Sequence, residues 1–231
     1  KEVLHDINIT LPKNSLTALV GPSGSGKSTV MKLCARFYDP QKGCIFFNGV
    51  PMNEINPESL MSHISMVFQD VYLFQDTIRN NIRFGKTDAT EEEIIAAAKK
   101  ACCHDFIMRL PKGYDTLVGE GGCTLSGGEK QRISIARAML KDAQIILLDE
   151  ATASLDPENE VEVQKAIDAL IKGRTVIAIA HRLKTIKGAD QIIVLDNGRI
   201  TEKGTHETLM QAKGLYAQLW NIQEQISGWK L

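Results

Sequence analysis

The feature that most constrains the fold is a glycine-rich stretch between an apolar run and a helical run. The apolar run Leu16–Val20 is strand-like, and after it the chain reads Gly21-Pro22-Ser23-Gly24-Ser25-Gly26-Lys27-Ser28-Thr29. This stretch fits G-x-x-x-x-G-K-[ST], whose glycines let backbone N–H groups face a phosphate without side-chain obstruction. The helical run Val30–Phe37 follows. A strand, a phosphate-binding loop and a helix in this order predict an α/β fold.

Two side chains of the loop have specific roles in such a site. Lys27 is expected to reach the β- and γ-phosphates of a nucleotide, and the Ser28 hydroxyl is expected to ligate Mg²⁺. The helix that begins at the loop adds the positive end of its dipole. The loop therefore predicts a bound nucleotide, and the alternative is a glycine-rich turn without a ligand.

Strand-like apolar runs recur along the chain, with helix-length segments between several of them. They are Leu16–Val20, Cys44–Phe47, Ile64–Phe68, Ile145–Leu148, Val176–Ala180 and Ile192–Leu195. This alternation predicts a mostly parallel sheet. We expect Val3–Thr10, Leu16–Val20 and Cys44–Phe47 to supply a small antiparallel β part, with turns at Asn48-Gly49 and Asn197-Gly198.

Residues 73–140 show a different pattern, without a convincing strand, and predict an inserted α-helical subdomain. Thr90-Glu91-Glu92-Glu93 is a capping box that opens an alanine-rich helix to about Cys102. A second short helix is expected at about His104–Arg109. Residues 1–72 and 141–231 are then expected to form a P-loop NTPase core of the RecA-like type, with the antiparallel part at its N-terminus.

Composition narrows the class of partner. The 231 residues include 43% hydrophobic side chains and carry a formal net charge of −1, so no basic field indicates nucleic acid. The apolar runs are too short to cross a bilayer, and we expect no membrane insertion by this segment. The five cysteines lack metal-ligand spacing and are expected to be buried, reduced thiols. The tail Leu215–Ile226 is expected to pack on the core through Leu215, Leu219, Ile222 and Ile226.

Polar residues follow the expected strands, and ligands of open α/β sheets bind beyond the carboxyl ends of strands. These residues are Gln69, Asp149, Glu150 and His181. Asp149 is expected to hold Mg²⁺ through its water shell, and Glu150 to orient and deprotonate the attacking water. Gln69 completes the metal or water shell, and His181 donates to the γ-phosphate. Singly, each has a structural alternative: a loop amide, helix-capping acids or a core histidine.

A second helix start able to hold phosphate lies at Leu125–Arg132. Ser126-x-x-Glu129 is a capping box at this helix start, and Ser126, Gly127 and Gly128 would present its N–H groups. Because this stretch belongs to the helical subdomain, we expect it to act on a nucleotide held by another copy. Arg132 and Arg137 of the same helix are expected to form structural pairs.

The order of these motifs over the whole chain resembles the nucleotide-binding domain of an ABC transporter. Gly21–Thr29 resembles Walker A, Gln69 the Q-loop, Leu125–Glu129 the signature motif, Ile145–Glu150 Walker B with its catalytic Glu, Ser154–Asp156 the D-loop and His181 the switch histidine. Thr116–Glu120, before the signature motif, is similar to an exporter-type segment that touches the transmembrane domains. Asp156 also reads as the N-cap of the helix that starts at Pro157.

The resemblance implies ATP and Mg²⁺ as ligands, and an ATPase that powers export from the cytoplasmic face of a membrane. It implies a head-to-tail pair of such domains, identical or different, with Ser126, Gly127 and Gly128 closing the partner's Walker A site. Transmembrane domains would be the other partners and would select the cargo, which leaves lipid, peptide, drug and siderophore export open. The start at Lys1 without a Met is expected to be the edge of a domain cut from a longer protein.

Three alternatives share the ATP-binding core. A non-transport ATPase of this family would act on nucleic acid or ribosomes, but the compact interval between the two phosphate-binding motifs and the near-zero charge weigh against it. An importer subunit would use the same chemistry, and Thr116–Glu120 weighs against it. A catalytically inactive regulatory module is disfavoured by Glu150 and His181.

Two positions depart from the family pattern. The first aromatic residue is Phe37, so the aromatic residue that stacks on adenine upstream of the first strand is missing. We expect it to precede Lys1 and this chain to bind ATP weakly without it. Glu129 stands where the family usually has Gln, and a carboxylate there offsets part of the helix dipole offered to phosphate.

Overall fold

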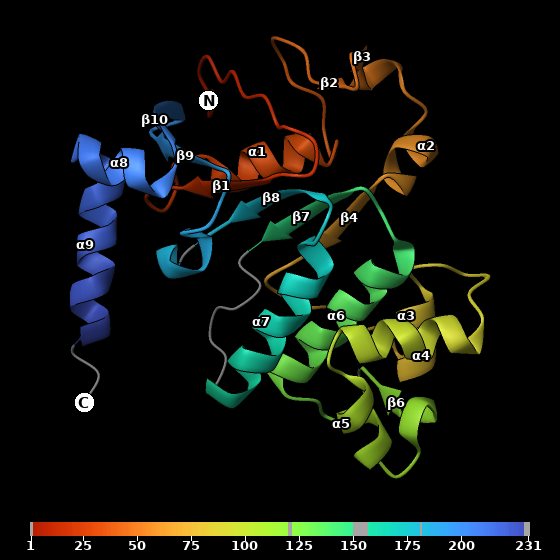
Figure 1. The fold of residues 1–231 in the computed structure, drawn as a ribbon. Coiled ribbons are helices and arrows are strands. Elements are labelled where there is room, and N and C mark those ends of the chain that lie inside the picture. The colour runs from red at the N-terminus through yellow and green to blue at the C-terminus, as the bar shows by residue number, and fades with distance from the viewer. Residues whose placement is uncertain (1, 120–121, 150–156, 181, 229–231) are drawn as a thin grey trace. The chain divides into compact units, whose positions relative to one another are not determined.

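The computed structural model describes residues 2–119, 122–149, 157–180 and 182–228. Side chains are described up to residue 225 and, in the helix that begins at Pro157, from residue 159 onward. Its main sheet has six strands in the order β10-β9-β1-β8-β7-β4 (Figure 1). Strand β1 pairs in parallel with both β8 and β9, whereas β10 is antiparallel to β9. The prediction of a mostly parallel sheet is confirmed.

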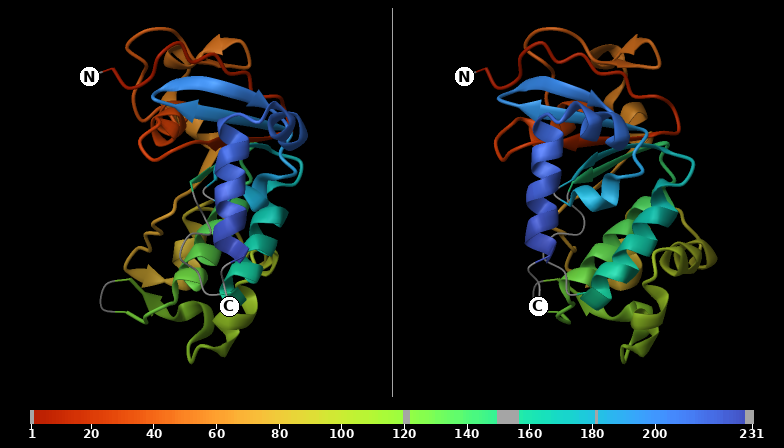
Figure 2. Two further views of the ribbon diagram at one scale, coloured as in Figure 1. Left: turned by 90° about the vertical axis from the view of Figure 1, so that its left-hand side faces the viewer. Right: turned by 60° about the vertical axis from the view of Figure 1, so that its left-hand side comes forward.

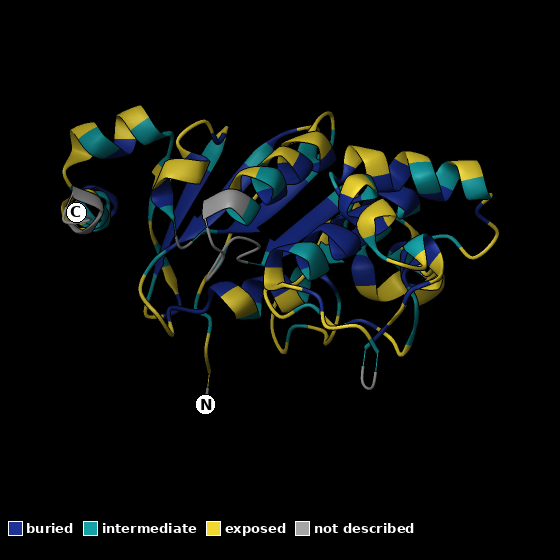
Figure 3. Ribbon diagram, turned by 90° about the horizontal axis from the view of Figure 1, so that it is seen from below, coloured by how far each residue is buried: buried dark blue, intermediate teal, exposed yellow. Residues whose placement is uncertain are grey.

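The chain forms two compact units. The first comprises Lys1–Met61, Thr175–Leu231 and the end of β7. Its elements are β1 (Leu16–Val20), α1 (Lys27–Cys34), β2 (Phe46–Phe47), β3 (Val50–Pro51), η1 (Met52–Glu54), α2 (Pro57–Ser62), β8 (Thr175–Ile179), η3 (Leu183–Ile186), β9 (Gln191–Asp196), β10 (Arg199–Gly204), α8 (His206–Ala212) and α9 (Leu215–Gly228). Strands β1, β8 and β9 of this unit are almost wholly buried, as dark blue arrows in Figure 3 show, whereas β10 has no buried residue.

The second unit comprises Ser62–Ile146 and helix α7. Its elements are β4 (Ile64–Val67), β5 (Asp76–Thr77), α3 (Ile78–Arg83), α4 (Glu91–Lys100), α5 (His104–Arg109), η2 (Gly113–Asp115), β6 (Leu117–Val118), α6 (Gly127–Lys141), the start of β7 (Ile145–Asp149) and α7 (Pro157–Ile171). Helix α6 packs against α3, α4, α7 and β4 and buries most of its length. The second unit is therefore organised around α6.

The expected strand Val3–Thr10 is wrong, because the structure has no strand there. Asp6 takes a left-handed conformation with φ 52°, which interrupts an extended run. The expectation that β1 belongs to the small antiparallel part is also wrong, because β1 lies inside the main sheet. The small antiparallel part is instead a hairpin of β2 and β3, in which only Phe46–Phe47 of the predicted run is a strand.

Both predicted Asn-Gly turns are present. Asn48 and Gly49 have φ of 51° and 82° and join β2 to β3, and Asn197 and Gly198 have φ of 45° and 73° and join β9 to β10. Two left-handed residues in succession match the right-handed twist of a two-residue hairpin. The hairpin partner β10 was not predicted, because its residues are mostly polar and read as solvent-exposed loop.

Helix predictions were confirmed where a local sequence signal marks the start of the helix. The capping box of α4 is present, since Thr90 Oγ1 accepts from Glu93 N and Glu93 Oε2 accepts from Thr90 N. Helix α5 spans the predicted residues. Helix α1 starts earlier than the predicted run, at Lys27, and ends before Arg36, whose φ is 53°. Residues 73–140 do contain two strands, β5 and β6, of two residues each.

The tail packs on the core as predicted, through Leu215 and Leu219 of the predicted face but not through Ile222, and the Ile226 side chain lies outside the described residues. Tyr216 of α9 is fully buried in a cluster with strand residues, and Leu215, Leu219 and Trp220 lie against that cluster. Ile222 is 53% exposed, because the buried face follows Tyr216 and Trp220 along the helix. Across the described ranges, no helix is long and apolar enough to cross a membrane.

The cysteines are free thiols, but only Cys103 is buried as expected. Cys44 follows a turn at Gly43, and Cys123 lies in the loop before α6, so both are exposed. Loop positions have few neighbours to cover a small side chain.

Candidate functional site

The phosphate loop follows β1 and depends on glycine at specific positions. Gly21, Gly24 and Gly26 have φ of 146°, 78° and 104°, in the region that favours glycine. A Cβ on Gly21 would lie 2.0 Å from the carbonyl oxygen of Leu195, and one on Gly26 would lie 2.6 Å from Leu4 Cδ2. The pattern of glycines is therefore required by the backbone path of the loop.

The side chain of Lys27 is hydrogen-bonded to the loop that precedes this residue. Its side chain is only 6% exposed although it carries a charge. The ammonium Nζ donates to the carbonyl oxygens of Gly21 and Pro22, both at 2.8 Å, and to Ser25 Oγ at 3.4 Å. Because these acceptors are neutral, an anionic phosphate would compete with them effectively for the ammonium group.

Helix α1 presents its N-terminus at the same loop. Gly26 is its N-cap, in the left-handed conformation. All of α1 is described, and its first turn has neither a side-chain cap nor an acidic residue. Its first N–H groups and the positive end of its dipole are therefore what an anion would meet there. Ser28 is exposed in this turn and Thr29 is half-buried.

Asp149 ends β7 and is half-buried there. In the sheet, β8 separates β7 from β1, and Figure 1 shows the three arrows pointing the same way. The carboxylate and the phosphate loop belong to the same compact unit, at the carboxyl ends of β7 and β1. A hydroxyl at Ser28 and a carboxylate at Asp149 are oxygen ligands of the type that Mg²⁺ prefers.

Gln69 lies two residues beyond β4, in the second unit, and its side chain is exposed. The residue before it is tied to α6, because Gln131 Nε2 donates to the carbonyl oxygen of Phe68 at 3.4 Å. Arg137 of α6 contacts the segment that follows Gln69. Its Nε donates to the carbonyl oxygen of Asn81 at 2.9 Å, and its guanidinium lies over the ring of Phe74.

The second helix start has the predicted capping box. Ser126 Oγ accepts from the backbone N of Glu129 at 3.2 Å, and Ser126 N donates to Glu129 Oε2 at 2.8 Å. Ser126 and Gly127 are exposed, whereas Gly128 is buried. A Cβ on Gly128 would lie 2.5 Å from Cβ of Asn159 on α7, so the helix start and α7 are in close contact.

The two arginines of α6 have structural roles, as predicted. Arg132 Nη2 donates to Asn159 Oδ1 at 3.2 Å, and its guanidinium lies 5.1 Å from the ring centre of Phe106. The Arg137 guanidinium lies over the rings of Phe74 and Phe84, 5.4 Å and 5.6 Å from their centres. Asn159, which supports the start of α6, was missed by the sequence analysis. No local signal marks it, because its partners are on another helix.

Some predicted residues lie outside the described residues. They are Glu120, Glu150, Ser154, Leu155, Asp156 and His181. The structure therefore places the phosphate loop and Asp149 in the first unit, and Gln69 and Ser126–Gly128 in the second.

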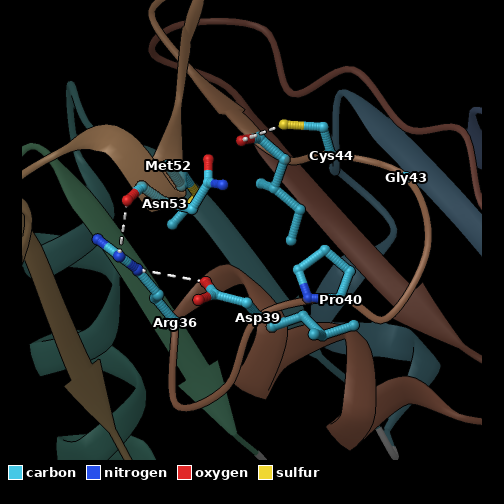
Figure 4. Close-up of a pocket in the computed structure, with 9 residues that line it drawn as sticks. Arg36, Asp39, Pro40, Gly43, Cys44, Met52 and Asn53 are labelled. Carbon is cyan, nitrogen blue, oxygen red and sulfur yellow. Dashed lines mark hydrogen bonds and ion pairs between the residues drawn. The ribbon is translucent and has the colours of Figure 1, made fainter.

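A cavity of about 60 Å³ lies elsewhere in the first unit, lined by residues that include Arg36, Asp39, Cys44 and Asn53 (Figure 4). Its lining residues lie between Leu33 and Asn53 and include none of the phosphate loop. Arg36, which lines the cavity, donates to the carbonyl oxygen of Ile55 at 2.7 Å and to Asp39 Oδ1 at 3.3 Å. The cavity is thus separate from the phosphate loop.

Comparisons of the sequence with a family model and with known proteins agree on one family. The family model described as ABC transporter matches residues 4–153. An ATP-dependent lipid A-core flippase of Legionella pneumophila (strain Paris) is 52% identical over 97% of this chain and 38% of its own length. ATP-binding cassette sub-family B member 6 of Rattus norvegicus is 50% identical over 97% of this chain and 27% of its own length.

A solved structure agrees with these relatives. It is the structure of a bacterial Atm1-family ABC exporter with ATP bound. The match covers 96% of this chain and 39% of that chain, with 48% sequence identity and a TM-score of 0.90. The chain therefore spans about two fifths of these proteins or less. At this identity and coverage, the chain belongs to the ABC transporter family.

Proposed function

We propose that this chain is the ATP-binding and ATP-hydrolysing domain of an exporter. The observation that carries the proposal is the phosphate loop at the start of α1, with buried Lys27 bonded to the loop and Asp149 in the same unit. The names of the relatives support export, because they are a flippase and an exporter of the Atm1 family.

The loop residues would bind the phosphates of ATP. The backbone N–H groups of the loop from Ser23 to Thr29 cradle the β- and γ-phosphates, and Lys27 leaves its carbonyl partners to neutralise their charge. Glu150, directly after Asp149, orients and deprotonates the attacking water. His181, directly after β8 and Ala180, donates to the γ-phosphate. Gln69 completes the shell around the water or the metal.

Mg²⁺ fits the donor set. Ser28 and Asp149 would hold it, with Gln69 as a further ligand, and bound Mg²⁺ would neutralise charge that develops on the phosphate oxygens. Among the described residues, no group of three or more His, Cys, Asp or Glu side chains forms a preformed metal cage. Mg²⁺ in nucleotide sites is normally held by one or two carboxylates together with phosphate, and Asp149 would supply such a carboxylate.

A second nucleotide-binding domain would complete the site. Ser126, Gly127 and Gly128 would contact the γ-phosphate of ATP bound by the partner, through the N-terminus of α6. Ser126 and Gly127 are exposed, and N–H groups of the helix start together with the Ser126 hydroxyl would make this contact. The pair would lie at the cytoplasmic face of a membrane. Its closure and opening would drive the transmembrane domains of the transporter.

The experiment compares the chain with Glu150→Gln. We expect Mg²⁺-dependent ATP hydrolysis by the unmodified chain, and unchanged ATP binding with hydrolysis reduced about a thousandfold in the variant. Lys141→Gln, at the far end of α6, is a control for loss of charge elsewhere in the domain. Full turnover by Glu150→Gln would reject Glu150 as the base, and absence of ATP binding by the unmodified chain would reject the proposed function.

A further inference from the structure

We infer that Gln223 of α9 is a positioning residue for the segment that follows β8, and this inference rests on the function proposed above. The backbone N of Leu183 donates to Gln223 Oε1 at 2.8 Å, across 40 residues of sequence. Leu183 is the first residue of η3 and lies two positions after His181. The bond therefore links the C-terminal helix to the part of the chain that carries the proposed γ-phosphate donor.

The described residues are fixed on both sides of position 181. Before it, the backbone N of Ala180 donates to the carbonyl oxygen of Leu19 on β1 at 3.2 Å. After it, Leu183 is held by Gln223. Ala180 and Leu183 are thus each bonded to another element of the same unit. Because Leu183 is two positions after His181, we expect loss of the bond to Gln223 to slow the step in which His181 is proposed to act.

Packing supports the same placement of η3. Leu183 and Ile186 are 2% and 3% exposed and belong to one apolar cluster with Tyr216. Leu219 and Trp220 of α9 lie against this cluster. Nonpolar contacts hold η3 near α9 but do not fix its register, whereas a hydrogen bond to one backbone N–H does.

Helix α9 is itself firmly attached to the unit. The carboxylate of Glu202 on β10 accepts from the backbone N of both Leu215 and Tyr216, at the first turn of α9. The Tyr216 hydroxyl is 2.9 Å from His206 Nδ1 on α8. Figure 2 shows α9 leaving α8 beside the β9–β10 hairpin. A helix anchored at its base provides a rigid support for Gln223, two turns further along.

The neighbouring ion pair contributes less. Lys184 Nζ lies 3.0 Å from Glu224 Oε1, but the two side chains are 59% and 46% exposed. Exposed ion pairs are screened by water and add little to stability. Gln223, which is half-buried and bonds to a backbone group, is therefore the residue expected to set the position of Leu183.

The test compares Gln223→Met with Gln218→Met in the whole chain. Methionine has a similar length but lacks the amide oxygen, and Gln218 is an exposed residue of the same helix. For Gln223→Met we expect hydrogen exchange at the Leu183 amide to rise about fivefold. We expect kcat for ATP to fall by about the same factor while KM stays within about twofold, because the phosphate loop is untouched. Gln223→Glu keeps an oxygen acceptor and should retain protection at Leu183.

The outcomes separate this inference from the proposed function. Equal kcat and equal Leu183 exchange in the two methionine variants would overturn the inference. A parallel loss of kcat, ATP affinity and Tm in Gln223→Met would also overturn it, since that pattern marks general destabilisation. Absence of ATP hydrolysis by the unmodified chain would instead reject the proposed function, and the inference with it.

Discussion

Ser126 and Glu129 bond to each other's backbone at the start of α6, at 3.2 Å and 2.8 Å. The carboxylate of Glu129 therefore lies at the N-terminus that is proposed to face a partner's ATP. It satisfies one N–H group of the helix start but also places negative charge where phosphate would bind. The capping role and the phosphate-binding role of this helix start have opposite preferences for charge.

Glu129→Gln should separate the two roles. Glutamine also completes a capping box, so Tm should stay within about 2 °C of the unmodified chain. Removal of the charge should raise the ATP-dependent dimer association constant about twofold to fivefold. Light scattering with ATP measures this. Glu93→Gln, the same change in the box of α4, is the matched control. Equal dimer fractions for all three proteins would contradict the charge argument.

Gly128→Ala should destabilise the second unit. The added methyl group would meet Cβ of Asn159 at 2.5 Å, in a contact between two helices that has no space for it. Overpacking of this kind costs about 1–3 kcal/mol in the free energy of unfolding. Urea unfolding followed by circular dichroism measures the change.

Gly188→Ala provides the control, because a Cβ at Gly188 would have no neighbour within 4 Å. Its free energy of unfolding should stay within about 0.5 kcal/mol of the unmodified value. If Gly128→Ala were as stable as Gly188→Ala, the close packing of α6 on α7 would be disproved.

Stability should fall at alkaline pH because of a buried thiol. Burial raises the pKa of Cys103 from 9.0 to about 12. The unfolded chain therefore releases this proton first, so the contribution is complete below pH 9 and declines as pH rises toward 12. Urea midpoints at pH 8 and pH 10.5 measure the decline. It should be smaller in Cys103→Ala and unchanged in Cys44→Ala, whose thiol is exposed. An equal decline in both variants would contradict this cause.

Local signals predicted much of the fold. The phosphate loop, both Asn-Gly hairpins and the capping boxes of α4 and α6 are each determined by a few adjacent residues, and all are present. Apolar runs predicted the buried strands because a strand covered on both faces is apolar throughout. These elements need no knowledge of distant partners.

Features that depend on distant partners were not predictable. The strand β10 is mostly polar and exists because β9 lies beside it. Asn159 supports α6 from another helix, and Gln223 reaches Leu183 across 40 residues. The run at Val3–Thr10 has a strand-like composition, but the left-handed Asp6 breaks it. Tertiary contacts decided the cases of β10, Asn159 and Gln223, and one sequence does not contain that information in local form.

The claim that two copies share each ATP site is tested most directly by mixing two inactive variants. Lys27→Ala removes the phosphate-loop lysine, and Ser126→Ala removes the signature hydroxyl. In a head-to-tail pair of the two, one site combines an intact phosphate loop with an intact Ser126. The mixture should therefore hydrolyse ATP, at no more than about a quarter of the unmodified rate, while either variant alone stays near background. A mixture no more active than its components at the same total concentration would contradict the shared site.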